Sequence, residues 1–400
     1  MSYDVNAVRE RFPALRSGTA HFDGPGGTQT PASVIAAVGE AWSRPLSIRG
    51  AGLPGEVNAE TIVVAFRRAM ADLLGADPAG IVFGRSATQL TYDFSRTLAD
   101  TWRPGDEVVV SRLDHDANIR PWVQAAGRAG AVVRWADFDP ATGELPARSV
   151  EAHLTERTRL VAVTGASNLI GTRPDVPAIA ELVHRAGALL WVDGVHLTAH
   201  HPVDLRRLGA DFFVCSPYKF FGPHHGVLSA RPQLLDTLRP DKLAPSTDAV
   251  PERFELGTLP YESLAGTRAA VDFIAGLGGS TADGRPERLR AAYAAIEAHE
   301  AALRQSVEAG LRRLDGVTVH SRAGERTPTL LLTFEGREAT DAYRFLARSG
   351  VHAPAGSFYA LEASRHLGLG DGGGLRVGLS AYNDADDVDR LLTGLADFLR

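Results

Sequence analysis

Short, continuously apolar runs alternate with longer stretches of helical spacing between residues 81 and 230. The runs cover residues 81–83, 107–111, 131–136, 160–164, 188–192, 212–216 and 226–230. An uninterrupted apolar run of this length is typical of a strand that is buried on both faces, as in a mainly parallel sheet. The alternation of such strands with helices predicts a doubly wound α/β domain.

A glycine-rich, polar segment at residues 276–286 separates this region from the rest of the chain. Helices are expected at residues 261–276 and 287–314, strands near Val317, Thr329 and Leu375, and further helices near Ala339 and Asp386. Segments rich in glycine and polar residues are typical of linkers. We therefore expect a large domain over residues 16–279 and a smaller C-terminal α+β domain over residues 280–400, to which residues 1–15 also belong.

Composition and charge narrow the range of functions. The chain has 400 residues and a formal charge of −6, so it lacks the excess of basic residues that attracts nucleic acid or anionic lipid. No apolar run approaches the ~18 residues that span a bilayer. Cys215 is the only cysteine, which excludes a disulfide within the chain and favours a reducing compartment. Residues 1–15 do not have the pattern of a signal peptide, and we expect a cytoplasmic protein.

Two charged residues follow successive apolar runs. Because ligands of α/β sheets bind beyond the carboxyl ends of the strands, residues at those ends are the first candidates for a site. Asp193 follows the run at 188–192, and Lys219 follows the run at 212–216. Taken singly, the aspartate is compatible with a cap of the next turn, and the lysine with a surface residue whose stem lies on aromatic rings. Together they predict a pocket that holds an anion and a nucleophilic amine, because burial lowers the pKa of a lysine.

This pair suits pyridoxal 5′-phosphate (PLP). A carboxylate keeps the pyridine nitrogen of PLP protonated, so that the ring acts as an electron sink, and a lysine carries the aldehyde. PLP also needs a phosphate site. The sequence IVFGRSATQL predicts a tight turn and a helix that begins at Ala87 and Thr88, whose backbone N–H groups and hydroxyl suit a phosphate. Ser216 offers a second hydroxyl.

The motifs around these residues resemble the class V aminotransferase family of PLP enzymes, of fold type I, and within it the cysteine desulfurase-like branch. The resemblance extends over nearly the whole chain. It implies the PLP-dependent transferase fold, in which the large domain has a mainly parallel sheet of the seven-stranded type. It also implies that Lys219 forms the Schiff base with PLP, that Asp193 pairs with the pyridinium, and that the substrate is an α-amino acid.

The resemblance assigns further contacts to the cofactor. In LDHDANIRPW, His115 matches the histidine that stacks on the PLP ring and takes part in catalysis. In GASNLIGT, Asn168 matches an asparagine beside the ring hydroxyl, and His196 stands where the family has a glutamine near the same hydroxyl. The residues that match phosphate contacts are Ala87, Thr88 and Ser216.

Other matches concern the substrate and a second subunit. In RFELGTLPYE, Thr258 matches a threonine that reaches the cofactor of the other subunit, which implies a homodimer. In LRVGLSAYN, Arg376 matches the arginine that binds the substrate carboxylate in a bidentate pair. Gly26 is expected to bring backbone close to the substrate, and Arg49 is expected to face it.

The chain lacks the loop cysteine with which cysteine desulfurases accept sulfur as a persulfide. The corresponding region, residues 351–360, offers Ser357 and Tyr359 but no thiol. Cys215 lies within a predicted strand, and if Ser216 faces the phosphate, alternation along the strand directs Cys215 away from it. We therefore expect C–S or C–Se cleavage, or β-elimination, without a persulfide cysteine.

Other interpretations remain open at this point. Transamination is the nearest alternative, and epimerisation, decarboxylation and kynureninase-like cleavage also occur in the family. A hypothesis from another class is a PLP-binding protein without turnover, against which the retained Arg376 argues. GAGLPG at residues 50–55 matches the spelling of a dinucleotide-binding loop, but no clean strand precedes it. The paired histidines lack the spacing of a zinc site, and no metal is expected.

Overall fold

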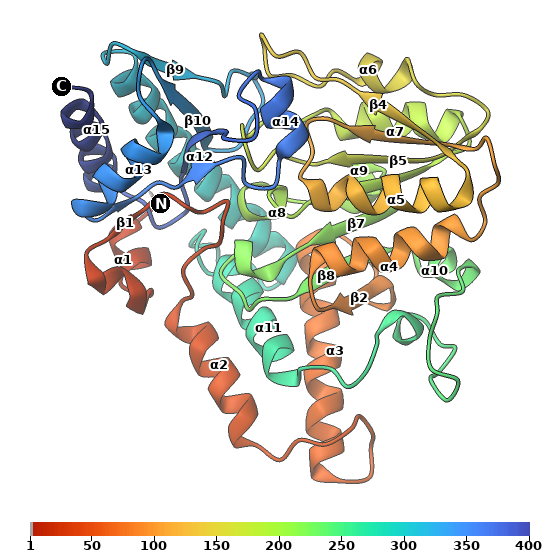
Figure 1. The fold of residues 1–400 in the computed structure, drawn as a ribbon. Helices are drawn as coiled ribbons and strands as arrows, with labels where there is room; N and C mark the ends of the chain where they lie inside the picture. Colours follow the sequence, from red (N-terminus) through yellow and green to blue (C-terminus); the bar gives the residue numbers. More distant parts are fainter. Residues whose placement is uncertain (1–2) are drawn as a thin grey trace.

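The computed structural model describes residues 3–400. Residues 1 and 2 of the segment 1–15, which the sequence pattern assigns to the smaller domain, lie outside the described residues. Within residues 3–400 a central seven-stranded sheet has the order β2-β8-β7-β6-β5-β3-β4. Its strands are β2 (Ile81–Gly84), β3 (Glu107–Ser111), β4 (Val132–Ala136), β5 (Thr158–Thr164), β6 (Leu189–Asp193), β7 (Phe212–Cys215) and β8 (Gly226–Ala230). Each lies on one of the apolar runs, which confirms the predicted α/β fold (Figure 1).

The sheet is mainly parallel, as predicted. Strands β4, β3, β5, β6 and β7 pair in parallel, whereas β8 is antiparallel to both β7 and β2. The turn that joins β7 to β8 contains no long crossover helix, and a short connection of this kind returns the chain antiparallel. The expectation that every run is buried on both faces is wrong for β4. This strand has only β3 as a neighbour, and Val132 keeps 40% of its surface exposed.

Helices cover both faces of the central sheet, because side chains alternate along its buried strands. On one face, α4 (Ala87–Ala99) and α5 (Arg120–Ala129) pack Phe94 and Trp122 against Trp191 and Phe212. The core on the other face contains side chains of α3 (Pro54–Leu74), α7 (Val176–Arg185), α11 (Tyr261–Ala275) and α12 (Arg285–Leu311). The shorter helices of this part are α6 (Ala147–Glu151), α8 (Leu197–His200), α9 (Leu205–Leu208) and α10 (Pro232–Thr237).

A second sheet, antiparallel, is formed by the C-terminal part. Its order is β12-β13-β10-β9, with β9 (Val317–Val319), β10 (Thr329–Phe334), β12 (Ala355–Gly356) and β13 (Gly374–Gly378). Helices α13 (Ala339–Arg348) and α15 (Ala385–Leu399) contribute side chains to its core, and α14 (Leu361–His366) follows β12. A separate pair joins β1 (Ala20–His21) to β11 (Val351–His352) in parallel. The predicted C-terminal strands and helices are therefore present.

We retain the division into domains at residues 16–279 and 280–400 (with 1–15) as a proposal. Ala20 and Phe22 share the hydrophobic core of the C-terminal sheet, although the proposed division places them in the large domain. Arg9, in α1 (Val5–Arg9), forms ion pairs with Asp384 and Asp387.

The remaining helical segment, α2 (Ala32–Ser43), packs against α11, which also packs against α3, at the lower end of Figure 1. The GAGLPG loop at residues 50–55 runs directly into α3, whose first residue is Pro54. The structure has no strand between the end of α2 at Ser43 and the start of this loop. The strand that leads into a dinucleotide-binding loop is therefore missing. Across residues 3–400, every helix is either too short or too polar to cross a membrane.

Candidate active site

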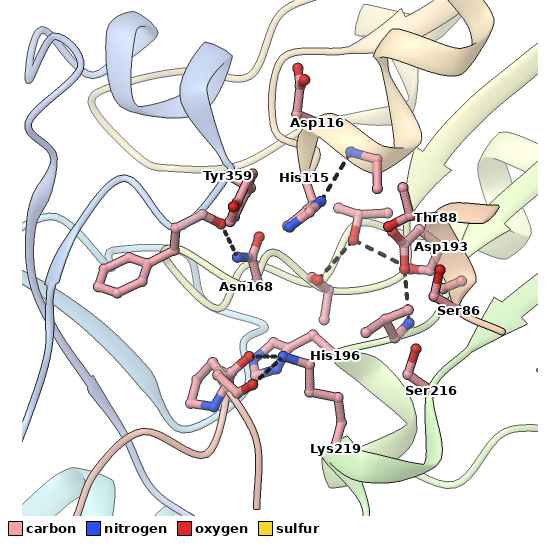
Figure 2. Close-up of a pocket in the computed structure, with 18 of the residues that line it drawn as sticks. Ser86, Thr88, His115, Asp116, Asn168, Asp193, His196, Ser216, Lys219 and Tyr359 are labelled. Atoms are coloured by element: carbon pink, nitrogen blue, oxygen red, sulfur yellow. Dashed lines mark hydrogen bonds between the residues drawn. The ribbon is translucent and has the colours of Figure 1, made fainter. Parts of the chain in front are cut away.

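A cavity of about 840 Å³ lies at the carboxyl ends of the central parallel strands. Thr164, Asp193 and Ser216 reach it from the ends of β5, β6 and β7, and Phe358 and Arg376 reach it from the C-terminal part. Figure 2 shows Ser86, Thr88 and Ser216 on one side of the cavity, Asn168 and Tyr359 on the other, and Lys219 pointing into it. The position agrees with the rule for ligand sites in open α/β sheets.

The N-terminus of α4 forms one wall of the cavity. Ser86 caps this helix by accepting the N–H of Gln89 at 3.0 Å, and Ala87 and Thr88 follow as its first residues. Gly226 allows β8 to approach this turn closely. A Cβ at that position would lie 2.3 Å from the carbonyl carbon of Ser86 and 2.5 Å from the nitrogen of Ala87. Free backbone N–H groups at a helix N-terminus suit an anion such as a phosphate.

Asp193 ends β6 and is 8% exposed. Its Oδ1 accepts the N–H of Val195 at 2.9 Å. Burial raises the pKa of this carboxyl to about 6, against the opposing effects of that hydrogen bond and of the Lys219 ammonium. A cationic group bound beside Asp193 would stabilise the ionised form further, because opposite charges lower the pKa of an acid.

Lys219 follows β7, in the short 3₁₀ turn η4 (Pro217–Lys219), and is 8% exposed. Its Nζ donates hydrogen bonds to the carbonyl oxygens of Pro25 and Gly26 and lies 4.7 Å from the ring centre of Tyr218. Burial, followed by the nearby charge of Arg376, lowers the pKa of this amine to about 7. A large fraction of Lys219 is therefore uncharged and nucleophilic near neutral pH.

His115 presents a neutral ring to the same cavity. Its Nδ1 accepts the N–H of Ala117 at 3.0 Å, which places the ring proton of the neutral form on Nε2. Burial, with smaller contributions from Lys219 and Arg376, lowers its pKa to about 4. The ring also stacks on that of Tyr359, with centres 5.5 Å apart and planes inclined by 29°.

Four residues that line the cavity have a buried side-chain atom without a hydrogen-bond partner in residues 3–400: Asp116 (Oδ1), Asn168 (Oδ1), His196 (Nδ1) and Arg376 (Nε). The Nδ2 group of Asn168 donates to the carbonyl oxygen of Phe358 at 2.9 Å. The Nε2 atom of His196 lies 2.9 Å from the hydroxyls of both Thr327 and Thr329. Burial places the pKa of His196 well below its usual value, so its ring is neutral.

Arg376, on β13, is 2% exposed. Its Nη2 donates to Oδ1 of Asp23 at 2.6 Å, and its Nη1 donates to the carbonyl oxygen of Asn168 at 3.2 Å. The ring centre of Phe358 lies 3.7 Å from the central carbon of the guanidinium. A buried, planar cation of this kind can bind a carboxylate in a bidentate pair.

The structure thus brings together ten of the predicted site residues around one cavity. They are Gly26, Ala87, Thr88, His115, Asn168, Asp193, His196, Ser216, Lys219 and Arg376. Arg49 is not among the residues that line this cavity and forms ion pairs with Glu60 and Glu252, so its contact with substrate stays a prediction. Its basic side chain is satisfied by these carboxylates. Thr258 also lies outside this cavity, at an exposed bend, and its contact with the cofactor of another subunit stays a prediction.

Sequence reasoning missed several residues of the cavity wall. Ser86 had a recognisable signal, because serine followed three residues later by glutamine marks a helix N-terminus. Asp23 and Phe358 had none, since they reach Arg376 from distant parts of the chain.

The single thiol of the chain does not reach the cavity. Cys215 is fully buried in the hydrophobic core on the face of α3 and α7, and it is not among the residues that line the cavity. Burial, with the nearby Asp193 carboxylate, raises the pKa of this thiol. The region at 351–360 contributes Phe358 and Tyr359 to the cavity wall. A buried thiol with a raised pKa is a poor nucleophile.

Comparison with known proteins gives a consistent picture. The family model described as "Aminotransferase class-V" matches residues 20–391. An uncharacterized protein of Mycobacterium tuberculosis, MT3887, is 33% identical over 398 residues, with 99% of each chain covered. A "probable cysteine desulfurase" of Pseudomonas aeruginosa is 32% identical and covers 97% of this chain and 96% of its own. Among solved structures, the cysteine desulfurase CsdA of Escherichia coli is similar over 100% of both chains, with a TM-score of 0.87 and 25% identity.

Proposed function

Because this chain belongs to the aminotransferase class-V family and is a PLP-dependent enzyme, we propose that it is a lyase acting on an α-amino acid. The proposed reaction is C–S or C–Se cleavage, or β-elimination, without a persulfide cysteine. The observation that carries the proposal is the composition of the cavity wall. None of its lining residues within 3–400 is a cysteine, and Cys215, the last residue of β7, is buried in the hydrophobic core.

Two of the unpartnered atoms of the cavity test whether these residues fit PLP. Asn168 Oδ1 and His196 Nδ1 are polar, buried and without partners among the described residues, so a ligand with a polar ring substituent would satisfy them. The N-terminus of α4 provides an anion site, Asp193 a counter-anion and Lys219 an amine. The chemistry of this set of groups fits PLP at its phosphate, pyridinium and aldehyde.

When bound, PLP supplies an electron sink for the charge that develops at the substrate Cα. We assign the phosphate to Ala87, Thr88 and Ser216, with the partner subunit's Thr258 completing the site in a homodimer. We assign the pyridinium to Asp193 and the ring face to His115, and the ring hydroxyl to Asn168 and His196. A neutral His115 suits this position, because a charged imidazolium would oppose the protonated pyridine.

In the proposed reaction, Lys219 removes the proton from the substrate Cα. Its pKa of about 7 leaves the amine partly neutral at the pH of the cytoplasm, where we propose the enzyme acts. Arg376 binds the α-carboxylate and thereby fixes the Cα relative to the amine. Phe358 and Tyr359 form the wall where a sulfur-accepting thiol would be needed, so the departing group leaves as a free species.

A product analysis with cysteine, cystine and selenocysteine tests this proposal. From cysteine and selenocysteine we expect sulfide and selenide, each with pyruvate and ammonia, and from cystine we expect the persulfide of cysteine with pyruvate and ammonia. All three should form without an added thiol acceptor. We expect Cys215→Ser to retain the wild-type rate within about twofold, because the thiol lies outside the cavity. Loss of activity in a folded Cys215→Ser variant would instead mean that sulfur passes through this residue.

The same experiment separates the remaining alternatives. Formation of a keto acid with the cofactor left in its amine form would identify a class V aminotransferase. An unchanged cofactor spectrum with every amino acid of a broad panel would indicate a PLP-binding protein without turnover. The buried Arg376 favours an enzyme over a binder, because a protein that only holds PLP has no need for a carboxylate site.

A further inference from the structure

The guanidinium of Arg376 is held by contacts on several sides before any substrate is present. It is 2% exposed, and a buried charge of this kind is strongly unfavourable without a counter-charge. The ring of Phe358 covers one face of the guanidinium at 3.7 Å. The Nη1 group donates a hydrogen bond to the carbonyl oxygen of Asn168 at 3.2 Å. The Nε atom is buried and has no hydrogen-bond partner among the described residues, so the edge formed by Nε and Nη2 is the one left for an anion.

Asp23 occupies that edge. Its Oδ1 lies 2.6 Å from Nη2 of Arg376, and the burial of the two side chains differs sharply, at 42% exposed for Asp23 and 2% for Arg376. Asp23 also lines the cavity that contains Lys219. The half-exposed carboxylate of Asp23 can become fully hydrated at a small cost in free energy, whereas the buried guanidinium of Arg376 stays in place. The pair therefore has one fixed member and one that can be displaced.

The turn at residues 23–27 is shaped to place this carboxylate. The N–H groups of Gly26 and Gly27 both donate to the carbonyl oxygen of Asp23, at 2.9 and 3.0 Å. The carboxylate lies against the Cα of Gly26, where a Cβ would be 2.3 Å from Oδ2 of Asp23. The carbonyl oxygen of Gly26 accepts from Lys219 Nζ at 3.0 Å. One glycine-dependent turn thus contacts both Arg376 and Lys219.

We propose that Asp23 is a built-in counter-anion of Arg376 that the α-carboxylate of the substrate must displace. This inference rests on the proposed role of Arg376 in substrate binding. A neutral amide or a simple amine cannot displace a carboxylate from a guanidinium, so Asp23 restricts the enzyme to substrates with a free carboxylate. It also weakens the binding of every such substrate, because part of the binding free energy is spent on separating Asp23 from Arg376.

Binding of propanoate and of its neutral analogue propanamide to the cofactor-loaded, full-length protein tests the inference by calorimetry. We expect Asp23→Asn to bind propanoate about tenfold more tightly than the wild type, since a competing like charge has been removed. Propanamide binding should stay unchanged. Equal or weaker binding of propanoate by Asp23→Asn would overturn the inference and show that Asp23 holds Arg376 in place.

A second variant changes the position of Asp23 and keeps its charge. Gly26→Ala would introduce a Cβ into the space of the carboxylate and move it off Arg376. We expect tighter propanoate binding here as well, and unaltered affinity in a folded Gly26→Ala protein would count against displacement. Thermal melting checks the fold of each variant.

Arg376→Met separates this inference from the proposed function. It should abolish propanoate binding, and if it does not, both the carboxylate site and the role of Asp23 are refuted. A protein that follows all the binding expectations but turns over no amino acid would refute the proposed function alone.

Discussion

The lowered pKa of Lys219 predicts a chemical reactivity that can be measured separately for each lysine of the chain. With a pKa of about 7, about half of the Lys219 side chains are neutral at pH 7. An ordinary lysine with a pKa of ~10.4 is neutral in only about one molecule in 2,500 at that pH. In the cofactor-free protein, Lys219 should therefore react with a small amine reagent at pH 7 about a thousandfold faster than an ordinary lysine of equal access.

Reductive methylation with formaldehyde, followed by peptide mass spectrometry, measures this reactivity. The chain contains only two lysines, Lys219 and Lys242, so each modified peptide reports on one known amine and Lys242 serves as the internal reference. We expect the rate at Lys219 to level off with a midpoint near pH 7. A midpoint above about pH 9 would refute the reasoning, because it would mean that the amine is well solvated in the cavity.

The charges around Lys219 predict shifts of opposite sign. Arg376 lowers the pKa of Lys219, and Asp23 raises it. Arg376→Met should therefore move the midpoint upwards and Asp23→Asn downwards. The same displacement of the pKa links stability to pH. Because the folded protein resists protonation of Lys219, its stability should rise between pH 7 and pH 10.5, by at most about 5 kcal/mol for a pKa of about 7.

Two further variants test the proposed cofactor site. Asp193→Asn should keep PLP bound but lower turnover by about 10²–10³, because the ring nitrogen loses its counter-anion; full activity would exclude this role. Gly226→Ala should weaken PLP binding about tenfold or more in an equilibrium titration, because its Cβ would lie within 2.5 Å of the Ser86–Ala87 peptide and displace the N-terminus of α4. An unaltered affinity in that variant would mean that the phosphate binds elsewhere.

The order of strands and helices was predictable because it depends on local pattern. Each apolar run became a strand of the central sheet, and α4 begins at Ala87 as its turn signal indicates. The pattern did not reveal that β8 runs antiparallel or that β4 is partly exposed. Both depend on which strands are neighbours, and the sequence of a single strand does not contain that information.

The sequence by itself also indicated the chemistry of the site. Asp193 and Lys219 each follow an apolar run, and β6 and β7 proved to be parallel neighbours, so both reach the same cavity. The absence of a cysteine at residues 351–360 was likewise visible from the sequence alone. These inferences succeed because parallel strands bring their carboxyl ends to one edge of the sheet.

Only the tertiary structure decided the protonation and the partners of these groups. The lowered pKa of Lys219 comes chiefly from burial, which depends on packing by segments as distant as Pro25 and Gly26. The pairing of Asp23 with Arg376 joins residues that are 353 positions apart. Desolvation and charge pairing are properties of a three-dimensional neighbourhood, and a local pattern of residue types cannot specify them.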